Sequence, residues 1–301
     1  MKTIITTGMA FADIDALACG IAYQELLEKL GKDSTFVIPG PLNNTVTKSI
    51  LKWDLTYNKT YSDTNNKFVI VDCSNPEVLS KEVNNITEVW DHRYGYQNNW
   101  DSQKIKVVIE EVGSCATLIW EEFKKTQQES SISKISANLL YTAIFSNTLN
   151  FNASVTTNRY IKAFEEIKMH TDLPENWIEI YYQESEEQII KDPKKAIIND
   201  SKIVNIPNKN INITIGQIEL WNSHDFINNN KETIKNTLLD FGNKMWFMTA
   251  PSISESKNYI YTEDQETKDN LTRLIDVDFE GDLGVTKKLW LRKEILKKML
   301  Q

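Results

Sequence analysis

Two short stretches, Phe68-Val-Ile-Val-Asp72 and Val89-Trp90-Asp91-His92-Arg93, decide the fold of this chain. Each is rich in the β-branched and aromatic residues that favour strands, and each run stops at an aspartate. The second stretch adds a histidine and an arginine directly after its aspartate. A carboxylate, an imidazole and a guanidinium released together at a strand end are suited to binding a metal ion and a phosphate group.

The segments around these stretches alternate between strand-like and helix-like sequence. Strands are expected at residues 3–7, 34–38, 68–71, 88–90 and 107–109, and helices at 16–30, 115–125, 135–145 and 156–169. This βαβ alternation predicts an α/β fold, in which a parallel sheet has helices on both faces. Because such sheets bind ligands beyond the carboxyl ends of their strands, Asp13, Asp15, Asp72 and Asp91-His92 should meet at one edge.

The sequence changes character after about residue 175. An acidic helix is expected at 177–190, and Ile211-Asn-Ile-Thr-Ile-Gly-Gln-Ile-Glu-Leu220 alternates apolar and polar residues as a sheet strand does. Further strands at 203–206, 244–249 and 259–261 and a helix at 234–241 complete the pattern. We therefore expect a first domain over residues 1–187, linker included, and a smaller α+β domain over 188–301.

Composition narrows the class of protein. The 301 residues include 34 Lys and Arg against 42 Asp and Glu, and the net charge of -8 argues against general nucleic-acid binding. We see neither an apolar run of the ~20 residues that a membrane helix needs nor a convincing signal peptide. Three cysteines are too few for a disulfide framework, so a cytoplasmic protein is expected. The C-terminal basic run reads first as a solvated helix face; it comprises Lys287, Lys288, Arg292, Lys293, Lys297 and Lys298.

Several acidic positions have two interpretations when each is taken alone. Asp13 and Asp15, spaced by two, can bind a hard cation through oxygen, but either can also cap the helix that follows. Asp72 can be a ligand or a turn-forming aspartate after a strand. His92 stands between Asp91 and Arg93, which a merely structural histidine would not require.

Taken together, the motifs resemble those of the DHH phosphoesterase superfamily. They are Asp13-Ile-Asp15 after Gly8, Asp72 at a strand end, Asp91-His92-Arg93, and Glu111-Val-Gly-Ser-Cys-Ala-Thr117, in that order. The family II inorganic pyrophosphatases and the exopolyphosphatase/prune branch are the most similar, and Asp-His-Arg is the form of the latter. In the second domain, Asp200-Ser-Lys202, Ile215 to Leu220 and Leu291-Arg292-Lys293 also resemble family motifs.

The resemblance implies metal-dependent hydrolysis of phosphoanhydride bonds in pyrophosphate or inorganic polyphosphate, in a cleft between the domains. Mn²⁺ or Mg²⁺ would be the cofactor, and the protein would be a monomer or homodimer that binds neither membrane nor nucleic acid. The implied catalytic residues are Asp13, Asp15, Asp72 and His92. One metal would be held by Asp15, Asp72, His92 and Asn147, and a second by Asp13 and Asp72. The implied phosphate ligands are Arg93, Lys202, Arg292 and Lys293.

Two positions depart from the family pattern. Met9 replaces a histidine or asparagine, and a thioether is a poor ligand for Mg²⁺ or Mn²⁺. Asn147 replaces an aspartate and brings no charge. We expect either a weakened two-metal site or one metal held by protein and one recruited with substrate. A degenerate member that binds a phosphorylated ligand or a protein partner without turnover is the alternative. Phosphodiester hydrolysis is a third reading, which the motifs of the second domain disfavour.

Overall fold

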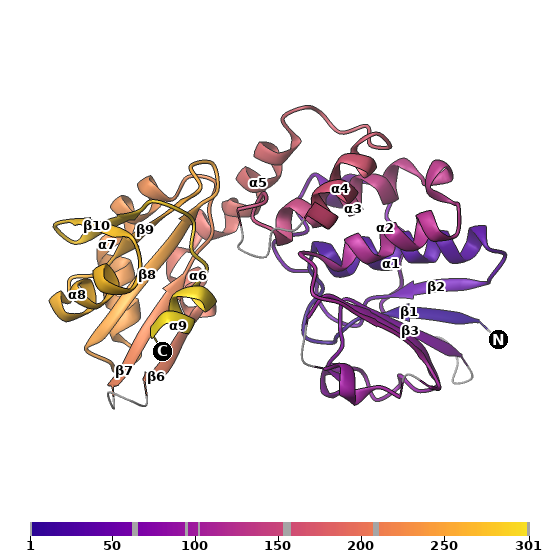
Figure 1. The fold of residues 1–301 in the computed structure, drawn as a ribbon, viewed down its shortest axis with the longest axis horizontal. Helices are drawn as coiled ribbons and strands as arrows, with labels where there is room; N and C mark the ends of the chain where they lie inside the picture. Colours follow the sequence, from indigo (N-terminus) through magenta and orange to yellow (C-terminus); the bar gives the residue numbers. More distant parts are fainter. Residues whose placement is uncertain are drawn as a thin grey trace. The chain divides into compact units, whose positions relative to one another are not determined.

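The computed structural model describes residues 2–61, 66–93, 96–101, 103–152, 158–206 and 211–299, without the side chains of 188, 211 and 293. The chain forms two compact units, shown in Figure 1. The first unit runs to Ile178 and the second starts at Glu179, with Asn152 joining the second. The division falls near the start of helix α5 (Trp177–Lys191), and the predicted boundary at 187/188 lies within that helix.

The first unit is built on a five-stranded parallel sheet, which confirms the predicted α/β class. The strand order is β2-β1-β3-β4-β5. The strands are β1 (Thr3–Thr6), β2 (Ser34–Val37), β3 (Lys67–Val71), β4 (Ile86–Asp91) and β5 (Lys106–Ile109). Val71 of β3 pairs with Trp90 of β4. This register carries Asp72 and His92 past the same edge of the sheet, since parallel strands end on the same side.

Four α-helices pack against one another over one face of this sheet (Figure 1). They are α1 (Ile14–Lys29), α2 (Cys115–Lys125), α3 (Lys134–Asn147) and α4 (Asn158–Lys168). Gly20 lets α1 approach β2, because a Cβ at that position would lie 2.1 Å from the Phe36 ring. Close packing thus fixes the helix that carries Asp15 against the sheet.

The opposite face differs from the expectation of helices on both faces. Its apolar side chains, among them Ile4, Phe68 and Val89, are covered by Tyr61, Leu79 and other residues of the connections between strands. Right-handed crossovers must place these connections opposite α1, because the chain reverses direction across the sheet after β2. Within the described parts of these connections, the helical segments are three-residue 3₁₀ turns: η1 (Ile50–Lys52), η2 (Pro76–Val78) and η3 (Gln97–Asn99).

The second unit contains a six-stranded mixed sheet between two layers of helices. Its order is β10-β11-β9-β8-β7-β6, and β7 and β8 are parallel. The strands are β6 (Ser201–Ile206), β7 (Ile211–Gln217), β8 (Met245–Ser252), β9 (Lys257–Tyr261), β10 (Val277–Glu280) and β11 (Leu283–Thr286). In β8, Trp246 and Met248 face one apolar cluster and Phe247 faces the other, as strand alternation requires.

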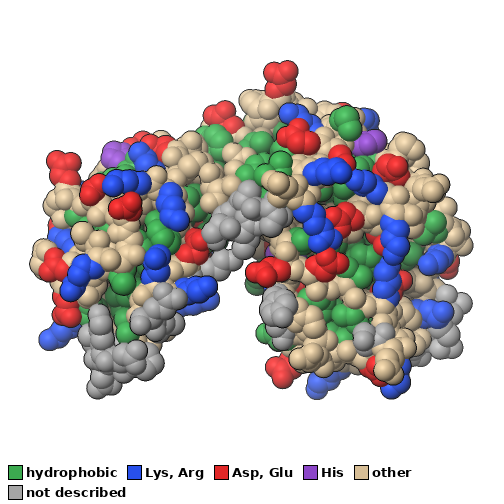
Figure 2. Space-filling model, viewed as in Figure 1, with side chains coloured by type: hydrophobic (Ala, Val, Ile, Leu, Met, Phe, Trp, Pro, Cys, Tyr) green, Lys and Arg blue, Asp and Glu red, His purple; other side chains and the backbone are tan. Residues whose placement is uncertain are grey.

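The helices of this unit divide between the two clusters. α6 (Pro193–Asn199) and α7 (Ser223–Leu239) contribute to one, and α8 (Gln265–Leu274) and α9 (Arg292–Met299) to the other. Across the described residues, no helix combines the length and apolar character needed to cross a membrane. Acidic and basic side chains are interspersed over the visible face of each unit in Figure 2.

Candidate metal centre

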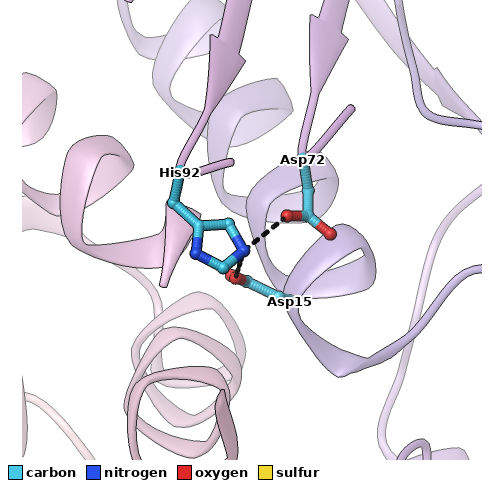
Figure 3. Close-up of side chains that lie close together, drawn as sticks. All are labelled: Asp15, Asp72 and His92. Atoms are coloured by element: carbon cyan, nitrogen blue, oxygen red, sulfur yellow. Dashed lines mark ion pairs between the residues drawn. The ribbon is translucent and has the colours of Figure 1, made fainter. Parts of the chain in front are cut away.

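Three side chains from separate segments meet beyond the carboxyl ends of β3 and β4. They are Asp15 in the first turn of α1, Asp72 just after β3, and His92 just after β4 (Figure 3). One potential ligand atom from each lies within 4.8 Å of the other two. We refer to these three residues as the candidate metal centre. Oxygen, oxygen and imidazole nitrogen together form a donor set that divalent metal ions use.

Asp72 turns into the centre through an unusual backbone conformation. Its φ is +50°, in the left-handed region that aspartate tolerates better than most residues. The side chain is almost fully buried, and Oδ1 has no hydrogen-bond partner among the described residues. This oxygen lies 3.4 Å from His92 Nε2. A buried carboxylate oxygen without a partner is costly, so a bound cation would stabilise it.

His92 is oriented by a hydrogen bond behind the centre. Its Nδ1 lies 3.2 Å from the carbonyl oxygen of Val112, and a carbonyl can only accept, so Nδ1 carries the proton. Nε2 faces Asp72 Oδ1 and has no hydrogen-bond partner within the described parts of the chain, so once it loses its proton its lone pair is free for a metal ion. Metal-binding histidines are commonly held in this way.

Asp15 is fully buried and held by the N-terminus of α2. Its Oδ2 accepts from the Cys115 amide at 2.8 Å, and its Oδ1 accepts from the Ala116 amide and the Ser114 hydroxyl, both at 2.9 Å. The amides at a helix N-terminus stabilise a negative charge. A Cβ at Gly113 would lie 2.6 Å from the Thr148 methyl, so glycine is needed where the chain enters this helix. The motif around Ser114 therefore fixes Asp15.

Asn147 approaches the centre as a hydrogen-bond donor. Its Nδ2 donates to Asp15 Oδ2 at 2.5 Å. The family resemblance implies a metal ligand at this position, but here the amide nitrogen, rather than the carbonyl oxygen, contacts the cluster. A coordinating role for Asn147 would require the amide to turn over.

Asp13 adopts the capping role that the sequence left open. Its Oδ1 accepts from the Ala16 amide at 2.9 Å and caps α1. Its Oδ2 lies 4.0 Å from Arg93 Nη2. Met9, which precedes Asp13 in the same connection between β1 and α1, is 42% exposed. Asp13 therefore borders the candidate metal centre on the Arg93 side.

The turn after β4 depends on Asp91, to which the sequence alone assigned no role. Its buried Oδ1 accepts from the amides of His92, at 2.7 Å, and Arg93, at 3.2 Å. Arg93 then donates from Nη1 to the Asp72 carbonyl oxygen at 2.6 Å. Asp91 thus positions both residues that follow it, and its location directly before them at a strand end was the available signal.

The electrostatics of the cluster favour a cation. Burial, followed by the charges of Asp13 and Asp15, raises the pKa of Asp72 to about 8. Burial alone would lower the pKa of His92, but the neighbouring Asp72 and Asp15 carboxylates raise it to about 9. In both cases the negative charge of the neighbouring carboxylates favours retention of a proton. A divalent cation would take the place of those protons, so the residues present fit a metal ion.

Comparison with known families agrees with this geometry. The profile of the DHH family, N-terminal domain, matches residues 3–144. Residues 3–144 form a DHH-family domain. Asp15, Asp72, Asp91, His92 and the 111–117 motif, which lie far apart in sequence, all belong to this DHH domain.

Curated proteins that match this chain do so at low sequence identity. They include proteins assigned as manganese-dependent inorganic pyrophosphatases from Lactobacillus gasseri (27% identical over 158 residues, 51% of this chain and 50% of the relative) and Bacillus licheniformis (26% over 172 residues, 56% and 55%). A third, from Listeria welshimeri, is 24% identical over 237 residues, 77% of this chain and 75% of the relative. The chain spans about half the length of the first two relatives.

Solved structures extend the similarity to the fold of the chain. A Methanococcus jannaschii protein assigned to the family II inorganic pyrophosphatases has a TM-score of 0.66 at 18% identity, covering 100% of this chain and 98% of its own. An exopolyphosphatase-related protein from Bacteroides fragilis has a TM-score of 0.55 at 12% identity, covering 99% and 90%. At these identities the likeness concerns the fold alone.

The predicted phosphate ligands of the second unit have varied surroundings. Arg292 is 9% exposed and donates from Nη1 to the Asp200 carbonyl oxygen at 2.6 Å and from Nη2 to its Oδ1 at 2.5 Å. Lys202 is exposed on β6. The side chain of Lys293 lies outside the described part of the chain. Phosphate binding by these three residues, and a site between the two domains, remain predictions.

Proposed function

We propose that this protein hydrolyses phosphoanhydride bonds with a divalent metal ion, and that pyrophosphate is the first substrate to test. The observation that carries the proposal is the pair of buried ligand atoms, Asp72 Oδ1 and His92 Nε2, that face each other without hydrogen-bond partners in the described structure. Asp15 adds a third ligand at a helix N-terminus. The names of the curated relatives support pyrophosphate as the substrate and Mn²⁺ as the metal.

In this proposal, Asp15, Asp72 and His92 hold the cation. A divalent ion bound there would lower the pKa of a water molecule and polarise a phosphoryl oxygen. The imidazole ligand favours Mn²⁺ over Mg²⁺, which prefers an all-oxygen shell. Arg93 is 47% exposed and lies 3.4 Å from Asp72, so its outer edge is available to a phosphate oxygen. Asp91 positions His92 and Arg93 through the turn after β4.

A second candidate is binding of a phosphorylated ligand or a protein partner without hydrolysis. The specific observation in its favour is the Asn147 amide, which donates to Asp15 Oδ2 and competes with a cation for that oxygen. The exposed Met9 side chain adds no metal ligand next to Asp13. This candidate predicts that pyrophosphate binds but is not cleaved.

A phosphate-release assay separates the two candidates. Purified protein is given pyrophosphate, tripolyphosphate or long polyphosphate with Mn²⁺, Mg²⁺ or Co²⁺ in turn, and a chelator provides the blank. We expect orthophosphate from pyrophosphate or tripolyphosphate with Mn²⁺, and less with Mg²⁺. Calorimetry with pyrophosphate is run in parallel. Binding without release under every metal would reject hydrolysis in favour of the second candidate.

A further inference from the structure

The two oxygens of the Asp72 carboxylate have different surroundings. Oδ1 is buried, has no hydrogen-bond partner among described residues, and lies 3.4 Å from His92 Nε2. Oδ2 instead lies 3.4 Å from Arg93 Nη2. One side of the carboxylate is therefore open to a ligand, whereas the other already faces a positive charge.

Arg93 lies among carboxylates from three segments. Besides Asp72 Oδ2, its guanidinium lies 4.0 Å from Asp13 Oδ2 at the start of α1 and 3.7 Å from Asp91 Oδ1 at the end of β4. The hydrogen bond from Nη1 to the Asp72 carbonyl oxygen, at 2.6 Å, orients the group further. The guanidinium thus occupies the position in which a cation shared by Asp13 and Asp72 would lie.

A second divalent ion would find few ligands at this position. Asp13 Oδ1 is already used as the cap of α1, and Met9 offers an exposed thioether. An ion there would also lie beside the permanent charge of Arg93, and like charges at such short range repel strongly. On the other side of Asp72, Oδ1 faces His92 Nε2 at 3.4 Å, and no lysine or arginine is paired with it in the described structure.

We propose that Arg93 serves as a built-in cation in place of a second metal ion, so that the centre binds one divalent ion per chain. This inference rests on the proposed metal-dependent function, because it concerns the number of ions in the same site. Four carboxylates, from Asp13, Asp15, Asp72 and Asp91, surround the site. One divalent ion together with Arg93 neutralises most of that charge.

Equilibrium binding of Mn²⁺ tests the number of ions per chain without measuring turnover. Free Mn²⁺ is quantified by its electron paramagnetic resonance spectrum, and binding is followed in parallel by calorimetry. The wild-type protein should bind one tight ion per chain. Arg93→Met preserves length but removes charge, so a second ion should bind roughly tenfold tighter than any second ion in the wild type, since Asp13 and Asp72 lose their shared partner. Arg93→Lys should retain one ion.

A matched control is Arg159→Met. Arg159 also lies between two carboxylates, those of Glu110 and Glu121, with a similarly exposed side chain. Its removal should leave the number of tight ions at one, which excludes the effect of freeing any two acidic groups. Thermal unfolding of each variant reports whether it is folded.

Asp13→Asn provides an independent test if Arg93→Met fails to fold. Asparagine can still cap α1, and the wild-type number and affinity of ions should persist within about threefold, because Asp13 faces Arg93. Loss of an ion in Asp13→Asn, two equally tight ions in the wild type, or a single ion in folded Arg93→Met would overturn the inference. Two ions together with hydrolysis would leave the proposed function intact, whereas one ion without hydrolysis would reject that function alone.

Discussion

The candidate metal centre and the Asp200–Arg292 pair both bring carboxylates and basic side chains together, but only the first contains buried polar atoms that lack hydrogen-bond partners in the described structure. In the DHH domain, Asp72 Oδ1 and His92 Nε2 are buried with no hydrogen-bond partner in the described structure. In the second unit, both terminal nitrogens of Arg292 are hydrogen-bonded to Asp200, and its backbone amide donates to Gln217 Oε1. Buried polar groups without partners destabilise a fold, and here two of them, both able to bind a metal ion, face each other across 3.4 Å, which favours a bound cation.

The largest expected effect comes from replacing Asp72, whose Oδ1 has no hydrogen-bond partner in the described structure. Asp72→Asn should lower kcat for pyrophosphate by about 10³-fold, because the amide removes the charge that holds the cation. Asparagine tolerates the φ of +50° at this position, so the backbone should be preserved. Phosphate release and circular dichroism measure the two quantities. Asp33→Asn is the matched control, since Asp33 is exposed and lies at the far end of β1; an unchanged rate in Asp72→Asn would remove Asp72 from the site.

The second unit contains a buried carboxyl group of its own, Glu186, which sharpens the comparison. Burial raises the pKa of Glu186 to about 7 from its usual 4.5, opposed by a hydrogen bond from the Trp221 amide. The folded state therefore keeps a proton that the unfolded chain releases, and stability falls as pH rises from about 4.5 to 7. Glu186→Gln should raise the free energy of unfolding by about 2–3 kcal/mol at pH 8, with little gain at pH 4.

Urea unfolding at the two pH values measures this difference. Glu179→Gln, at an exposed acidic position on the same helix, serves as the control and should keep the wild-type loss of stability between the two pH values, because Glu186 is retained. An equal gain at pH 4 and pH 8 in Glu186→Gln would show that ionisation of Glu186 is not the cause.

Arg292→Met tests whether the second region is closed as the contacts indicate. Loss of two charge-assisted hydrogen bonds to Asp200 should lower the free energy of unfolding by about 2 kcal/mol. Arg273→Met on α8 is the control, with an expected change within about 0.5 kcal/mol for an exposed arginine. Unchanged stability together with a raised KM for pyrophosphate would instead show that Arg292 is free for substrate, and the contrast between the regions would fail.

Asn147→Asp should give the smallest effect. It replaces the amide donor on Asp15 Oδ2 with a carboxylate, so Mn²⁺ should bind roughly tenfold tighter in calorimetry. Asn138→Asp is the control, because Asn138 lies on the same helix and its amide also donates to a carboxylate, that of Asp172. Weaker binding in Asn147→Asp would mean that repulsion from Asp15 outweighs the added ligand.

Much of the first unit could be predicted from sequence. Buried parallel strands read as continuous apolar runs that end at polar residues, so all five strands were located within two residues. The second unit was harder. The sequence of α8, which follows its N-cap Asp264, is largely polar. The strands β10 and β11 have only four residues each, too few for a clear alternation of apolar and polar residues. α7 begins at Ser223 rather than near 234, because its asparagine-rich first half hides the helical period.

The candidate site divides in the same way. Asp15, Asp72 and His92 could be brought together from the end points of parallel strands and the start of the next helix. The hydrogen bonds that orient these side chains could not be predicted, because they join segments that are distant in the sequence. Ser114 reaches Asp15 across 99 positions and Asn147 across 132, and the direction in which an amide points depends on that packing. The Arg292–Asp200 pairing, across 92 positions, belongs to the same class.

The hydrogen bonds between Asp15 and the first amides of α2 should respond to an ion bound at the candidate metal centre. The amide protons of Cys115 and Ala116 point at the carboxylate that would share its charge with a cation. Withdrawal of electron density from Asp15 would weaken both hydrogen bonds, so the two amide resonances in a nitrogen-15 spectrum would report occupancy. With a diamagnetic divalent ion such as Mg²⁺, these two amides would report ion binding without a measurement of turnover.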